Sequence, residues 1–188
     1  MLDQFALKFV LQGEPTTTPV LFCFGVLGFI GALVFQSQSK NALQRAPYFA
    51  LSMILTLVVN AFSFVWLLSL QAMAAGVLWV IIVFTLLILA FSGFVYGAIA
   101  LVRSRDFFGH GRYAFLALIP FANFVLLLRA SRNTGSLNRI PTIPLLSGGL
   151  GVLSGFIMLV LGGAIGVTLD QQMDKMLADA EYTPELQS

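Results

Sequence analysis

Charged side chains are scarce in this sequence, and residues that carry out chemistry are scarcer still. Asp, Glu, Lys and Arg make up 10% of its 188 residues, whereas soluble domains contain about 25%. There is one cysteine, Cys23, and one histidine, His110. A lone cysteine excludes a framework of intrachain disulfides, and these two residues alone cannot supply the ligands of a zinc site. We therefore expect no metal and no cofactor.

The four longest apolar segments also lack every ionisable residue type: none contains Asp, Glu, Lys, Arg or His. Ionisable groups within a membrane ordinarily mark proton relays and ion paths, so their absence argues against a coupled pump. A serine hydrolase needs a base within hydrogen-bond reach of its nucleophile, but His110 lies outside these segments. We expect a protein without catalytic residues, and an enzyme is the less favoured alternative.

What the sequence has in abundance is hydrophobic residues, which make up 59% of the chain, with a mean hydropathy of +0.94. A hydrocarbon core of roughly 30 Å is crossed by a helix of about 20 apolar residues. Four segments meet this length, at 19–35, 48–70, 77–102 and 145–169. The sequence therefore predicts an all-α polytopic membrane protein with a bundle of four transmembrane helices, forming a single domain over residues 1–188.

The basic residues are concentrated between the apolar segments. Eight of the ten lie in three short stretches: Lys40 and Arg45; Arg103, Arg105 and Arg112; Arg129, Arg132 and Arg139. Lys and Arg are enriched in cytoplasmic loops of membrane proteins, and Trp and Tyr at the membrane boundaries. We therefore predict a bacterial inner-membrane protein with these stretches in the cytoplasm and both termini in the periplasm. Tyr48, Tyr96 and Tyr113 would then lie near the inner boundary.

A further apolar segment, 113–128, separates two of the basic stretches and contains Pro120. As a helix its sixteen residues would span about 24 Å, which is short for a membrane core. If it crossed, six basic residues would lie inside and four outside, instead of eight and two. We favour a re-entrant segment broken at Pro120, and a short complete span is the alternative. Near the bend, Asn123 would either bond backbone groups freed by the proline or contact a ligand or partner.

The two ends of the chain have helical patterns of their own. Residues 1–13 combine apolar positions with a polar stripe, which is typical of a helix lying in the membrane interface. Residues 170–188 form a polar, acidic tail in which a helix would continue into the periplasm. This tail would pack on the N-terminal helix or meet a partner.

Small residues recur on single faces of two predicted spans: Ser147, Gly151, Gly155, Gly162 and Gly166 on the fourth, and Gly93 and Gly97 on the third. Such residues let transmembrane helices approach closely. These faces would pack within the chain or, alternatively, form a homo-oligomer or bind another protein. Asn60 is the strongly polar residue near the middle of a span, where an interhelical hydrogen bond is its expected role and a polar passage is the alternative.

The loop from Arg103 to Arg112 is the densest candidate site. With Arg129 and Arg132 beside it, its arginines (Arg103, Arg105 and Arg112) would form a cytoplasmic basic rim, flanked by Phe107 and Phe108. Each basic residue near an anionic leaflet contributes about 1 kcal/mol of attraction. The rim would bind anionic lipid head groups, or would serve only to orient the chain.

The run Arg103-x-x-Asp106-x-x-Gly109-x-Gly111, followed by apolar and aromatic residues into Ile119-Pro120, resembles a family signature. The family comprises small bacterial inner-membrane proteins known as a domain of unknown function. This sequence departs from it at four positions: Ser104, Arg105, Phe107 and Tyr113. The resemblance covers about thirty residues and implies an inner-membrane location, but it implies no activity.

Taken together, these patterns favour a non-catalytic accessory or scaffold protein that associates with a larger membrane complex and with anionic lipid. The alternative is a transport protein for a small solute or a lipid, using the Asn60 face and segment 113–128. No pattern predicts a nucleic-acid partner.

Overall fold

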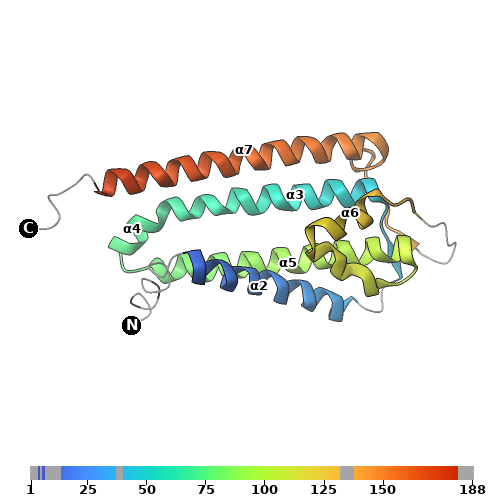
Figure 1. Cartoon of the computed structure of the whole chain (residues 1–188), viewed down its shortest axis with the longest axis horizontal. Coiled ribbons are helices and arrows are strands. Elements are labelled where there is room, and N and C mark those ends of the chain that lie inside the picture. The colour runs from blue at the N-terminus through green and yellow to red at the C-terminus, as the bar shows by residue number, and fades with distance from the viewer. Residues whose placement is uncertain (1–3, 5, 7–13, 37–39, 132–137, 182–188) are drawn as a thin grey trace, which may run out of the picture.

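Four long apolar helices run along the molecule (Figure 1). The computed structural model describes residues 4, 6, 14–36, 40–131 and 138–181. The long helices are α2 (Glu14–Phe35), α3 (Arg45–Ser63), α5 (Leu78–Phe108) and α7 (Gly148–Glu181). A 3-10 helix, η1 (Phe64–Leu68), and a short helix, α4 (Ser69–Ala74), continue α3. The prediction of four apolar helices long enough to cross a membrane is confirmed.

The helix ends differ from those expected from hydropathy. Helix α5 runs to Phe108, six residues beyond the predicted boundary, because the charged residues that follow Val102 are buried against other parts of the chain. Helix α7 begins at Gly148, after the 3-10 helix η3 (Pro144–Leu146), and continues through the acidic segment to Glu181. The predicted interfacial helix at 1–13 lies almost wholly outside the described residues.

The bundle consists of two close helix pairs joined by contacts between α3 and α5. Both α2 and α5 have glycines where the two helices cross. A Cβ atom at Gly28 of α2 would collide with the Ala90 carbonyl of α5, and a Cβ atom at Gly93 of α5 would collide with the Gly25 carbonyl of α2. Helix α3 pairs with α7, which lies along the opposite side of the molecule from α2 (Figure 1). Lipid offers no hydrophobic driving force for two helices to associate. The close approach of the backbones allows van der Waals contacts, and these contacts stabilise each helix pair.

Segment 111–128 folds as two short helices beside the end of α5. They are the 3-10 helix η2 (Gly111–Leu118) and α6 (Pro120–Leu128), with Ile119 extended between them. The helical conformation is disfavoured for a residue that precedes proline. Proline itself fits the first position of a helix, because a backbone N–H at that position would have no acceptor within the helix. The proline therefore starts a new helix, and the chain returns toward the end of the bundle from which it left.

A two-residue parallel strand pair brings two of the loops together at this same end. Strand β1 (Asn41–Ala42) pairs with β2 (Asn138–Arg139). The Leu43 N–H also donates to the Val102 carbonyl at 3.3 Å, which ties the first loop to α5. The described residues of the three basic stretches thus meet at one end of the bundle, called here the basic end. The main cluster of buried side chains also lies there, and it includes Phe29, Tyr48, Leu101 and Leu126.

Candidate functional site

Arg103 is buried at the basic end, with none of its surface exposed. Its Nε donates to the Leu126 carbonyl at 2.7 Å, and its Nη2 donates to the Arg129 carbonyl. These carbonyls belong to the C-terminal turn and cap of α6, where backbone acceptors lack intrahelical partners. Nη1 forms an ion pair with Asp106 at 2.6 Å. One side chain of α5 therefore holds the end of the 111–128 segment.

Asp106 and a second arginine of the basic end, Arg105, are also in the interior. Asp106 is 2% exposed and accepts a further hydrogen bond from the Ser131 hydroxyl. Arg105 is buried, and its Nη2 donates to the Gln36 carbonyl at 2.7 Å, just after α2. Arg103 and Arg105 are thus interior residues that bind other parts of the chain. The sequence had instead predicted that both would belong to a basic rim.

Arg112 and Arg129 are the members of the predicted rim that the structure places on the surface. The Arg129 guanidinium lies 4.9 Å from the centre of the Phe107 ring, within the range of a cation–π interaction. Phe107 is itself buried, so it packs inside the basic end. Arg132 lies outside the described residues. Binding of anionic lipid by these residues stays a prediction.

Most of the predicted small-residue faces pack within the chain. A Cβ at Gly155 would lie 2.5 Å from the Phe49 ring of α3, and a Cβ at Gly97 would lie 2.7 Å from the Phe29 carbonyl of α2. Gly162 lies against α3, whereas Gly151 lies against the Leu146 carbonyl. Gly166 has no described atom within 4 Å of its Cβ position. Ser147 donates to the Pro144 carbonyl at 3.0 Å, closing η3.

Asn60 forms the interhelical hydrogen bond expected of it. Its Nδ2 donates to the Gly162 carbonyl at 2.9 Å and so links α3 to α7. The neighbouring hydroxyls of Thr56 and Ser63 instead donate to carbonyls of their own helix, those of Ser52 and Val59. Ser and Thr commonly make this bond when they lie within a helix.

Asn123 makes bonds that neither alternative anticipated. Its Oδ1 accepts from the Tyr48 hydroxyl at 2.6 Å, and its Nδ2 donates to the Tyr96 hydroxyl at 3.1 Å. Tyr96 in turn donates to the Ala117 carbonyl at 3.2 Å. The amide therefore joins α6 to α3 and α5. Both tyrosines were predicted to lie at the membrane boundary, because tyrosine is enriched there, and no local sequence pattern shows that they share a partner.

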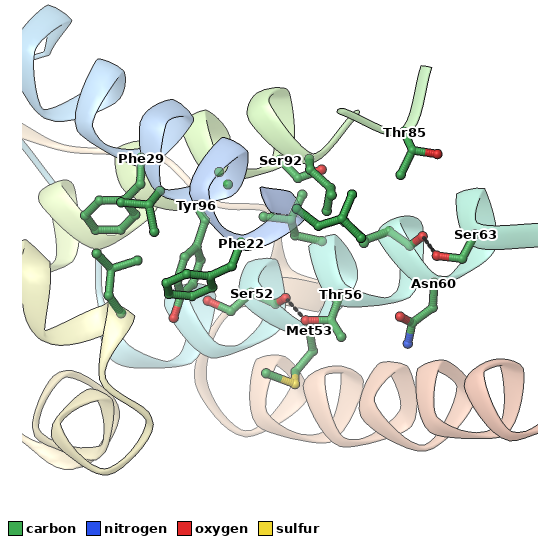
Figure 2. Close-up of a pocket in the computed structure, with 18 of the residues that line it drawn as sticks. Phe22, Phe29, Ser52, Met53, Thr56, Asn60, Ser63, Thr85, Ser92 and Tyr96 are labelled. Carbon is green, nitrogen blue, oxygen red and sulfur yellow. Dashed lines mark hydrogen bonds between the residues drawn. The ribbon is translucent and has the colours of Figure 1, made fainter. Parts of the chain in front are cut away.

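A groove of about 600 Å³ lies between α2 and α3 (Figure 2). Both helices pack on α5 but make few contacts with each other, so α5 forms the floor. Leu118, Asn123 and Leu127 of the 111–128 segment line it too. Its walls are mainly apolar and include Phe22, which is 64% exposed. The described residues that line the groove include no charged side chain.

Several hydroxyl groups also line the groove, on α2, α3 and α5. Those of Ser52, Thr56, Ser63 and Thr85 donate to the carbonyl four residues earlier, as the dashed lines in Figure 2 show for two of them. Each of these hydroxyl protons is therefore already bonded to a carbonyl of its own helix. Ser92, on α5, has no hydrogen-bond partner in the part of the chain that the structure describes.

Comparison of the chain with protein-family models, with curated proteins and with solved structures found no match. Within the described ranges, there is no group of three or more His, Cys, Asp or Glu side chains that could hold a metal ion. The geometry of the groove and of the basic end therefore carries the functional argument.

Proposed function

We propose that the protein is a non-catalytic membrane protein that binds a lipid in the groove between α2 and α3. The observation that carries this proposal is the groove itself, about 600 Å³ of space with mainly apolar walls inside a bundle of apolar helices. Ligand sites in proteins are mostly apolar and commonly measure about 300–1,000 Å³. Lipid tails are the apolar molecules most abundant around such a bundle.

The polar groups of the groove favour a lipid over a small polar solute. An ion or sugar needs partners that replace its hydration shell, because burying polar groups without hydrogen bonds is costly. Four of the hydroxyls in the groove donate their protons to their own helices. Of the two transport alternatives, lipid handling is therefore the one that the groove supports.

We further propose that the basic end faces the cytoplasm of a bacterial inner membrane, with segment 113–128 re-entrant from that side and both termini in the periplasm. The meeting of the three basic stretches at one end supports this orientation, because positive charge is retained in the cytoplasm. In this orientation the exposed Arg112 and Arg129 would contact anionic head groups.

An accessory role beside a protein partner is a second proposal, and it depends on α7. Among described atoms, none lies within 4 Å of a Cβ placed at Gly166, so another helix has room to approach there. Replacing Gly166 with leucine should then remove a co-purifying partner or lower the oligomer size in mild detergent. Unchanged partners and size would contradict this role.

A matched pair of glycine substitutions tests lipid binding. Gly25 lines the groove, and a Cβ there meets no described atom within 4 Å, so Gly25→Leu should fill part of the space. Gly163→Leu on α7 adds the same side chain at a position that is equally open but does not line the groove.

The measurement is photocrosslinking with a lipid that carries a diazirine in its acyl chain, followed by mass spectrometric mapping. We expect Gly25→Leu to lower labelling of α3 and α5 residues in the groove by about tenfold, which corresponds to about 1.4 kcal/mol. Gly163→Leu should leave that labelling unchanged. Equal labelling of the groove in the wild type and in Gly25→Leu would contradict the proposal.

A further inference from the structure

We infer that the groove selects its lipid by the length of the acyl chain, and that Leu118 and Leu127 limit the length it accepts. This inference rests on the proposed lipid binding and specifies the class of lipid by its chain. It depends on the length of the groove, on its closed end, and on the absence of charge from its described walls.

The groove extends along the helices over about the thickness of one membrane leaflet. Its lining includes residues from Thr18 to Phe29 on α2 and from Thr85 to Tyr96 on α5. Both stretches advance by eleven residues, and at about 1.5 Å per residue each is about 17 Å long. The Phe29 and Tyr96 rings lie 6.1 Å apart, so both stretches end at the same level. Half of a hydrocarbon core of about 30 Å is about 15 Å, so the acyl chain of one leaflet fits lengthwise.

The groove is closed where segment 111–128 packs on α5. Leu118 and Leu127 line the groove, and both also pack against the main cluster of buried side chains. Tyr96 donates to the carbonyl of Ala117, the residue before Leu118. Beyond Tyr96, α5 continues into the buried cluster, where Ala100 has no exposed surface. Side chains of the core therefore lie behind this end wall of the groove.

The walls and the closed end together fix how a lipid can lie in the groove. The described lining has no charged side chain, which matches an uncharged hydrocarbon chain. The closed end has core side chains behind it, so the terminal methyl group would lie against Leu118 and Leu127. The head would lie toward Thr85, which Figure 2 shows at the opposite end of the groove from Tyr96.

This arrangement makes chain length the quantity that is selected. A chain shorter than the groove leaves space at the closed end and loses van der Waals contacts there. A longer chain has to bend or displace the two leucines, and forcing extra methylenes into packed side chains is unfavourable.

The test is a competition between monoacylglycerols that differ only in chain length. A monoacylglycerol with a diazirine in its acyl chain labels the full-length protein in micelles, and unlabelled competitors from decanoyl to arachidoyl are added at equal mole fractions. We expect displacement of the label from groove residues to become stronger up to one chain length. It should then weaken by about fivefold for the next longer chain in the series, the smaller of the usual effects of overpacking.

Substitutions at the closed end should move this maximum. Leu127→Ala removes volume from the end wall, so the maximum should shift to a longer chain. Leu118→Phe adds volume there, so the maximum should shift to a shorter chain. Leu89→Ala is the matched control, because Leu89 lines the groove between Thr85 and Tyr96 and its loss widens the groove without lengthening it.

The outcomes separate this inference from the proposed function. Displacement that strengthens through arachidoyl in the wild type, or a maximum that both end-wall variants leave in place, would overturn the inference while leaving lipid binding intact. No labelling of groove residues by the probe would overturn both. Circular dichroism in detergent verifies that each variant retains its helices; if Leu127→Ala does not, the maxima of the wild type and of Leu118→Phe decide.

Discussion

Replacing Arg103 with methionine removes the side chain that ties the end of segment 111–128 to α5. The substitution leaves the Asp106 carboxylate, which is 2% exposed, without its cationic partner. It also leaves the Leu126 and Arg129 carbonyls without the guanidinium. Breaking a buried ion pair by removing one partner costs about 3–5 kcal/mol. We therefore expect the free energy of unfolding to fall by about 4 kcal/mol.

The assay is equilibrium unfolding in mixed micelles, followed by the fluorescence of Trp66 and Trp79. Arg103→Met combined with Asp106→Leu should be less destabilised than Arg103→Met alone, because the double variant contains no uncompensated buried charge. Arg112→Met is the control on the surface, where most substitutions change stability by no more than about 0.5 kcal/mol. A loss for Arg103→Met as small as that of the control would refute the conclusion that Arg103 holds this segment.

Two further predictions concern helix packing and topology. Gly155→Leu should destabilise the protein by about 1–3 kcal/mol, the typical effect of overpacking, because the new Cβ would lie 2.5 Å from the Phe49 ring. Gly163→Leu is the control and should leave the stability unchanged, because its Cβ meets no described atom within 4 Å. Equal stability of the two variants would contradict the contact between α3 and α7. In a cysteine-free background, Ser136→Cys should react with a membrane-impermeant maleimide only after the cytoplasmic side is exposed. Reaction in intact cells whose periplasm is accessible would contradict the re-entrant orientation.

The four apolar helices were predictable because length and hydropathy alone decide which segments can cross a membrane. The break at Pro120 was predictable for a similar reason, since proline acts on its immediate neighbours. The contacts of the glycine faces on α5 and α7 were anticipated as one of two alternatives, because small residues at helical spacing mark close approach whatever the partner.

The interior position of Arg103 was not predictable, because a charged residue after an apolar segment ordinarily marks a cytoplasmic loop. Its burial depends on carbonyls more than twenty residues away along the chain. The bond between Tyr48 and Asn123 spans 75 residues. The groove likewise results from α2 and α3 packing on α5 rather than on each other, and no local sequence pattern encodes that arrangement.

Native mass spectrometry of the protein extracted in mild detergent shows whether the groove holds a lipid. We predict that the wild type retains a bound lipid. We also predict that Gly25→Leu loses this lipid while Gly163→Leu keeps it. A lipid retained equally by all three proteins, or by none of them, would contradict the claim.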